Sequence, residues 1–239
     1  MRILDFIAVN GSSRGARVQL ASGLNASTCH DILKTLVYGG YLAYDEASKK
    51  YSLGPVLAAI GAQNYSDENL VSRSRPYLVN WSRETQFTAF IAQWLPDRTI
   101  VILDKVDSPL DIKMTVQIGQ RFPWSAAALG KAFMAYMDEN QIRSVVGSDD
   151  LPAYTPKSIR AQRSWLAELS SVRERGWSTS LAEYYRSTNS VAAPIFGPDD
   201  TVLAVVGSLA TVTDLKDADI ERFGALIRQM ADDIHSALG

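Results

Sequence analysis

The stretch at residues 23–36, GLNASTCHDILKTL, decides how the first part of this chain folds. Asn25 is typical of a helix start, because its side chain can accept a hydrogen bond from an amide that lacks a partner in the first turn. Apolar residues then recur at helical spacing, which gives the helix one apolar and one polar face. The apolar face comprises Cys29, Ile32, Leu33, Leu36 and Val37, and the polar face comprises Ser27, Asp31, Lys34, Thr35 and Tyr38. The stretch therefore predicts a short amphipathic helix with a small, polar outer face.

The segments around this helix predict a winged helix-turn-helix. The expected order is a helix at residues 2–9, a loop at 12–15, a helical turn at 17–21, and two strands at 41–44 and 50–53. Gly39 and Gly40 end the quoted helix before the first of these strands. Such a unit usually places its second helix in the major groove of DNA. Winged helices also serve as protein-interaction modules, so the fold alone leaves both functions open.

The composition fits a globular protein of the reducing cytoplasm. The chain has 239 residues, of which 46% are hydrophobic and 21% charged, with no apolar run long enough to span a bilayer and no signal peptide. Its one cysteine, Cys29, cannot form an internal disulfide, and one cysteine with two histidines is too few for a zinc site. We therefore expect a cytoplasmic protein without a metal or another cofactor.

Positive charge is concentrated in the first quarter of the chain. Residues 1–60 carry six Lys or Arg and four Asp or Glu, which gives +2, whereas the remaining 18 basic and 22 acidic residues give −4. A weakly basic N-terminal part followed by an acidic remainder is consistent with a DNA-binding domain joined to a regulatory domain, because phosphate contacts need only local positive charge.

The rest of the chain predicts an α+β fold. Helices are expected at residues 56–64, 69–85, 125–137 and 158–175 and along the apolar stripe 220–238, and strands at 87–94, 99–105, 112–118, 190–196 and 202–209. Strands that follow one another through short turns, such as the one at Pro96-Asp97, indicate an antiparallel sheet with helices packed on it.

Several fragments, in this order and spacing, resemble the IclR (isocitrate lyase regulator) family of bacterial transcription factors. They are GLNASTCHDILKTLVYGGYL (23–42), KKYSLGPVLAAIG (49–61), GQR (119–121), SAAALGKA (125–132), RGW (175–177) and VAAPIF (191–196). The resemblance implies a DNA-binding domain at residues 1–56, a linker helix at 57–72 and a GAF-like effector-binding and oligomerisation domain at 73–239. It also implies dimers or tetramers on a palindromic operator of catabolic genes, with no membrane partner.

In this family the effector is a small organic acid, and the resemblance places its site where residues 125–131 open a helix. A helix N-terminus suits an anion, because its amides are unpaired and its dipole is positive. The resemblance and the aromatic residues near it give the candidate effector-binding residues Trp94, Trp124, Ala127, Ala128, Leu129, Gly130, Ser180, Tyr184, Ser190 and Leu209.

Departures from the family pattern indicate what kind of acid is bound. Ser180 and Ser190 stand where relatives often have Asp and Cys, and Gly207 and Leu209 stand where they have two serines. Trp124 replaces a common Leu, and Ser125 a common His. With fewer polar groups and more aromatic ones, the site favours a benzoate or hydroxybenzoate, whose ring would pack on Trp124, Tyr184 and Trp94. The alternative is that Trp94 and Trp124 are core or interface aromatics.

The candidate DNA-binding residues lie in the winged helix. They are Arg14, Arg17, Asn25, Ala26, Ser27, Thr28, Asp31, Lys34, Lys49 and Lys50. Asp31 departs from relatives, which often carry Arg there; a carboxylate repels phosphates but can accept from a cytosine amino group. The alternative interpretation is that Asp31 orients Lys34 or a neighbouring basic residue. With so few basic residues, we expect modest, salt-sensitive affinity per subunit.

An enzyme is the competing class, and the sequence contains no catalytic constellation that supports it. The two histidines, His30 and His235, lie in no recognisable serine or cysteine motif, and no phosphate-binding glycine motif is present. Lys131 is better explained by packing or surface placement than by Schiff-base chemistry. The prediction is therefore a ligand-responsive DNA-binding regulator that is not an enzyme. The alternatives are a DNA-silent ligand-sensing interaction module and, with less support, an enzyme acting on small organic acids.

Overall fold

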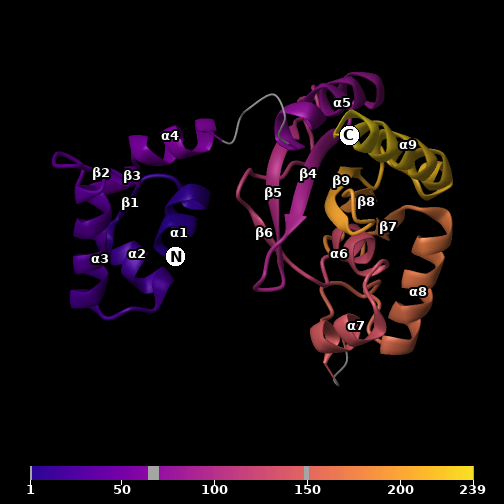
Figure 1. Ribbon diagram of the computed structural model, residues 1–239, viewed down its shortest axis with the longest axis horizontal. Helices are drawn as coiled ribbons and strands as arrows, with labels where there is room; N and C mark the ends of the chain where they lie inside the picture. The colour runs from indigo at the N-terminus through magenta and orange to yellow at the C-terminus, as the bar shows by residue number, and fades with distance from the viewer. Residues whose placement is uncertain (1, 64–69, 148–150, 239) are drawn as a thin grey trace. The chain divides into compact units, whose positions relative to one another are not determined.

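The computed structural model describes residues 2–63, 70–147 and 151–238, and its contacts divide the chain into two units (Figure 1). Unit 1 is Met1–Asn69 and unit 2 is Leu70–Gly239. The linker helix expected at 57–72 lies partly outside the described residues. The domain boundaries at residues 56 and 73 therefore remain predictions.

Unit 1 combines short helices with a small antiparallel sheet. Its elements are α1 (Arg2–Asn10), β1 (Ser13–Arg14), α2 (Gly15–Ser22), α3 (Ala26–Tyr38), β2 (Leu42–Asp45), β3 (Lys50–Leu53) and α4 (Pro55–Gln63), and the sheet order is β1-β3-β2. The Asn25 side chain caps α3 by accepting from the Thr28 amide at 2.8 Å. Cys29 and Leu33 are buried in the core of this unit, as the helical spacing predicts.

One prediction for unit 1 is wrong. Residues 12–15 are not simply a loop, because Ser13 and Arg14 form strand β1 and pair with Tyr51 and Lys50 of β3. Helix α2 then begins directly at Gly15. A strand of two residues has too little pattern to be seen in a sequence.

Unit 2 is built on a six-stranded antiparallel sheet in the order β6-β5-β4-β9-β8-β7. The strands are β4 (Thr88–Trp94), β5 (Thr99–Val106), β6 (Arg121–Pro123), β7 (Ser178–Leu181), β8 (Thr188–Phe196) and β9 (Val202–Thr211). The helices are α5 (Leu70–Thr85), α6 (Ala127–Met134), α7 (Glu139–Val146), α8 (Gln162–Arg175) and α9 (Ile220–Leu238), the last preceded by the 3₁₀ turn η1 (Asp217–Asp219).

Alternation along the strands sends side chains to two different cores. On one face, Ala89 and Ile91 of β4 pack with α5 and α9, which lie side by side (Figure 1). On the other face, Phe90 and Ala92 pack with α6. A third cluster, which includes Trp165 and Leu169, joins α6 to α7 and α8. The face covered by α6 is the one that carries the candidate effector site.

Several predicted boundaries in unit 2 are wrong. Residues 112–118 alternate apolar and polar but form no strand: Ile112 is 84% exposed, and the edge of β5 is occupied by β6 instead. The helix predicted at 125–137 ends at Met134, and a separate helix, α7, follows with Asp138 and Gln141 capping each other. The helix predicted from residue 158 begins at Gln162, and strand β7 was not predicted.

Within the described residues, no helix is long and apolar enough to cross a membrane.

Candidate functional site

A cavity of about 60 Å³ lies between α6 and the sheet in unit 2. It is lined mainly by apolar and aromatic side chains, with hydroxyl groups on one side. The lining residues are Phe90, Val116, Phe122, Ala126, Ala128, Leu129, Ser180, Tyr184, Tyr185, Thr188, Ser190 and Leu209. Six of them, Ala128, Leu129, Ser180, Tyr184, Ser190 and Leu209, are residues that the sequence singled out. None of the lining side chains carries a formal charge at neutral pH.

One end of the cavity is the N-terminus of α6. Among the described residues no side chain caps this helix at Ala126, so the amides of its first turn have no partner from a cap. Unpaired amides and the positive end of the helix dipole create a favourable position for an anion. Ala128 and Leu129 of the first turn line the cavity directly.

The glycine at the fourth position of α6 serves packing rather than ligand access. A Cβ atom on Gly130 would lie 1.8 Å from the backbone oxygen of Trp124, so only glycine lets the preceding segment fold back on the first turn. Gly130 itself does not line the cavity. The side chain of Ala127 lies outside the part of the chain that the structure describes.

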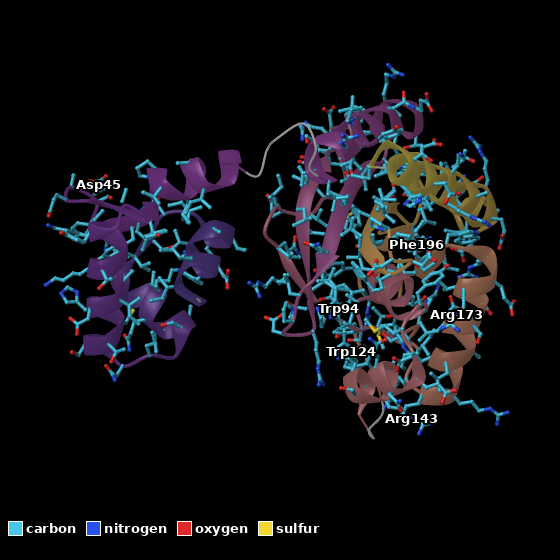
Figure 2. The ribbon with its side chains drawn as sticks, in the orientation of Figure 1. Asp45, Trp94, Trp124, Arg143, Arg173 and Phe196 are labelled. Atoms are coloured by element: carbon cyan, nitrogen blue, oxygen red, sulfur yellow. The ribbon has the colours of Figure 1, made fainter. Side chains whose placement is uncertain are left out.

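The two tryptophans predicted as walls of the site do not line the cavity. Trp94 packs edge-on against Phe133, with ring centroids 5.7 Å apart, and Trp124 packs against Trp165 at 6.0 Å. Both are labelled in Figure 2 and contribute to the cluster that holds α7 and α8. The aromatic walls are instead Phe90, Phe122 and Tyr185, which the sequence analysis missed, and Tyr184, which it predicted. The alternation that places Phe90 on the α6 face of β4 was the signal for the first of them.

An aromatic row encloses the cavity on the side of the β7–β8 loop. The ring of Tyr184 lies 5.8 Å from that of Phe122 and 4.5 Å from that of Tyr154. The Tyr154 and Ser125 hydroxyls are 2.7 Å apart, which ties this row to the segment just before α6. Burial raises the pKa of Tyr184 to about 12, so its phenol is neutral at physiological pH.

Lys131 is buried beneath this loop. Its Nζ donates to Glu183 Oε1 at 2.7 Å and to the Thr179 carbonyl at 2.9 Å, and Glu168 lies 3.8 Å away. The pair joins the body of α6 to the loop that carries Tyr184. Lys131 is therefore one partner of a buried structural ion pair. Of the two roles expected from the sequence, this agrees with packing and not with surface placement.

The ten candidate DNA-binding residues are all exposed on unit 1. Two of the basic ones already have partners: Lys49 forms a salt bridge with Glu46 at 2.7 Å, and Arg17 lies over the Phe6 ring, 5.7 Å from its centroid. At the tip of the β2–β3 hairpin, hydrogen bonds from the Ala47 and Ser48 amides hold the pKa of Asp45 (Figure 2) below its usual range. Few positively charged side chains of unit 1 are therefore available to contact phosphates.

Asp31 lies on the exposed face of α3. Among the described residues its carboxylate has no hydrogen bond and no salt bridge, although Lys34 follows it by one turn. The interpretation that Asp31 orients Lys34 therefore has no support in this structure, and a direct contact with a base remains a prediction.

Comparisons with known proteins agree on one family. A family model described as the C-terminal part of the bacterial transcriptional regulator IclR matches residues 62–236. The HTH-type transcriptional regulator XynR of Escherichia coli K12 is 28% identical over 91% of this chain and 86% of that protein. An IclR transcriptional regulator from Alicyclobacillus acidocaldarius superposes with a TM-score of 0.89 at 29% identity, covering 100% of this chain and 96% of the other.

A more distant structure has a ligand bound. An IclR homologue from Microbacterium hydrocarbonoxydans, crystallised with 4-hydroxybenzoate, superposes with a TM-score of 0.82 at 16% identity, covering 99% of this chain and 98% of the other. At this identity the likeness concerns the fold. Because the family model matches well over half of the sequence, the chain belongs to the IclR family of bacterial transcriptional regulators.

Proposed function

We propose that the protein is a cytoplasmic transcription regulator whose affinity for an operator is controlled by a small aromatic acid. Unit 1 acts as a winged helix-turn-helix, with α3 in the major groove and the β2–β3 hairpin as the wing. Unit 2 acts as the GAF-like effector domain. The observation that carries the proposal is the cavity, which meets an uncapped helix N-terminus at one end and aromatic walls along its length.

The cavity indicates the class of effector. A water molecule needs roughly 10–15 Å³ on this measure, so a cavity of about 60 Å³ suits a compact monocyclic molecule better than a long one. Since no cationic side chain lines it, the charge of the ligand is met only by the dipole and amides of α6. The site can therefore compensate the charge of a ligand with one carboxylate, but not that of a ligand with two or three.

The walls favour benzoate or hydroxybenzoate over a short aliphatic acid. Phe90, Phe122 and Tyr184 provide flat apolar contact for a ring, and Ser180 and Ser190 provide hydroxyls for a substituent. The bound 4-hydroxybenzoate of the Microbacterium homologue supports the idea that this fold can hold such a molecule. Of the residues predicted from sequence, we propose as ligand contacts those that line the cavity and leave out Trp94, Trp124 and Gly130.

DNA binding rests on the exposed outer face of α3 and the wing. Because few basic residues of unit 1 are available, the affinity of one subunit should be modest and should fall steeply with salt. A dimer or tetramer on a palindromic operator would compensate, since a second contact on the same duplex is intramolecular.

The test combines operator selection with ligand binding. Duplexes selected from a random pool by the full-length protein should contain an inverted repeat, and benzoates should change their affinity. Calorimetry should show tighter binding of benzoates than of short aliphatic acids. Leu209→Trp fills the cavity and should abolish binding, whereas Val212→Trp, at a site outside the cavity that is 37% exposed, should not.

Two results would contradict the proposal in different ways. Ligand binding without any enriched duplex would favour the DNA-silent sensing module, for which the unpaired Asp31 carboxylate on α3 is the supporting observation. Tighter binding of short aliphatic acids would overturn the aromatic class while leaving a ligand-responsive regulator.

A further inference from the structure

The cavity in unit 2 meets solvent at the β7–β8 loop, residues 182–187. Of the residues that line the cavity, only Tyr185 is exposed, at 50%, and most of the others, such as Phe90 and Leu209, are buried. Tyr185 packs edge-on against Tyr184, with ring centroids 4.7 Å apart. The position of these two tyrosines therefore decides how well the cavity encloses a ligand.

The β7–β8 loop begins in a backbone conformation that other parts of unit 2 must hold. Ala182, its first residue, lies in the left-handed region with φ of 59°. A residue with a side chain adopts this conformation at a cost and keeps it only where its surroundings enforce it. The Ala182 amide donates to the Thr188 carbonyl at 3.2 Å, which closes the loop. The contacts of Ala182 and Glu183 with the rest of unit 2 therefore fix the direction in which the chain leaves β7.

Two hydroxyl groups of the 151–160 loop supply these contacts. Thr155 Oγ1 donates to the Ala182 carbonyl at 2.7 Å, and Ser158 Oγ donates to the Glu183 carbonyl at 2.7 Å. The Glu183 side chain is held separately, by Lys131 of α6. Neither Thr155 nor Ser158 lines the cavity. They can affect a ligand only through the β7–β8 loop.

The 151–160 loop is a firm base for these two hydroxyls. The Leu151 amide donates to the Arg160 carbonyl at 2.9 Å, which brings the ends of the loop together. Leu151 is buried in the cluster that joins α6 to α7 and α8. Within the loop, Ser158 Oγ accepts from the Thr155 amide at 2.9 Å. The loop is therefore compact and anchored in the core, as is common for surface loops with a function.

We propose that Thr155 and Ser158 are positioning residues for the effector. Their hydroxyls hold the start of the β7–β8 loop in the arrangement that places Tyr184 and Tyr185 over the cavity. Without these bonds the loop populates other arrangements, and only the fraction that encloses the cavity binds the effector with full affinity. This inference rests on the proposed function, because it presupposes that the effector binds in the cavity.

The experiment measures binding of 4-hydroxybenzoate to the full-length protein by calorimetry. Thr155→Val keeps the shape of the side chain and removes its hydrogen bond. Since one hydrogen bond corresponds to roughly a tenfold change in an equilibrium constant, the Kd should rise about three- to tenfold. Ser158→Ala, which removes the bond to Glu183, should act in the same direction. Thr155→Ser keeps the hydroxyl and should restore the wild-type Kd.

Thr85→Val is the matched control, at the end of α5 on the face of the sheet opposite the cavity. Thr85 Oγ1 donates to the Trp81 carbonyl at 2.8 Å and accepts from the Phe87 amide at 3.1 Å. Thr155 Oγ1 likewise accepts from an amide two residues on, that of Lys157, at 3.1 Å. Both valine variants should lower the urea midpoint, but only Thr155→Val should raise the Kd. A role limited to stability would leave the Kd of the folded protein unchanged in both.

The outcomes separate the positioning role from the proposed function. An unchanged Kd in Thr155→Val, an equal rise in Thr85→Val, or no recovery in Thr155→Ser overturns the positioning role and leaves the proposed function in place. If the wild-type protein binds no benzoate, the aromatic effector is wrong, and hydrogen exchange of the free protein decides the positioning role. The amides of Ala182 and Thr188 should then exchange faster in Thr155→Val than in Thr85→Val, and equal exchange overturns the inference.

Discussion

Replacing Lys131 by methionine should destabilise unit 2 far more than its size suggests. The lysine side chain is 1% exposed and bonds to Glu183 at 2.7 Å and to the Thr179 carbonyl at 2.9 Å. Methionine keeps much of the volume but leaves the Glu183 carboxylate, which is 15% exposed, without its cation. Breaking a buried pair from one side costs about 3–5 kcal/mol, and we expect a value near 3 because Glu183 retains some contact with water.

The variant at the other partner of the ion pair should destabilise unit 2 less. Glu183→Gln removes a charge but keeps an oxygen that can accept from Lys131, and Glu168 remains 3.8 Å away as a second anion. We expect a loss of roughly 1–2 kcal/mol, within the range of one charge-assisted hydrogen bond. Lys131→Met combined with Glu183→Gln should be more stable than Lys131→Met alone, because no unpaired charge is left in the interior.

Urea unfolding followed by tryptophan fluorescence measures this directly. All five tryptophans lie between residues 81 and 177, so the signal reports on unit 2 alone. With a slope of roughly 2–3 kcal/mol per molar urea, a loss of 3 kcal/mol lowers the midpoint by about 1–1.5 M. Lys157→Met, at an exposed lysine, is the control and should leave the midpoint in place. A Lys131→Met midpoint equal to that of the control would refute the reasoning, and so would a larger loss for Glu183→Gln.

Three further predictions concern single contacts. Gly130→Ala should cost about 3 kcal/mol or more, since its Cβ would meet the Trp124 carbonyl, and the same fluorescence assay would show it. Asn25→Ala should cost unit 1 about 1 kcal/mol by removing the cap of α3, seen as a loss of helical circular dichroism on heating; Ser27→Ala, at an exposed residue beside it, should cost less. As pH rises from 10 to about 12, unit 2 should lose the stability that the raised pKa of Tyr184 provides below pH 10; Tyr184→Phe should remove that part of the loss, and an unchanged urea midpoint profile in the variant would contradict it.

Unit 1 was predictable because its signals are local. The cap at Asn25, the apolar face of α3 and the glycines before the wing all act within a few residues of one another, and the structure has each of them. Strand β1 was missed because its partner, β3, is more than thirty residues away in sequence. Residues 112–118 show the opposite failure: a strand pattern is present, but the edge of β5 is already paired with β6.

The candidate site was only partly predictable, because it is assembled from distant strands. Resemblance identified the first turn of α6 and the serines of β7 and β8, whose positions the motifs fix. The tryptophans were chosen for their chemistry, yet packing directs Trp124 toward Trp165 and away from the cavity. Thr188 and Phe122 carry no motif at all, and only the register of β8 with its neighbours and the path of β6 bring them to the cavity.

The buried polar groups of unit 2 are mostly paired, and the exceptions are not confined to the cavity. Buried hydroxyls elsewhere are bonded: Thr155 donates to the Ala182 carbonyl at 2.7 Å, and Ser108 donates to the Gln86 carbonyl at 2.5 Å. The exceptions among the described residues are Thr188 Oγ1, Trp165 Nε1 and Asn189 Oδ1, and only the first belongs to a residue that lines the cavity. An effector that binds one arrangement of the protein more tightly than another can alter DNA affinity by no more than that difference in binding free energy.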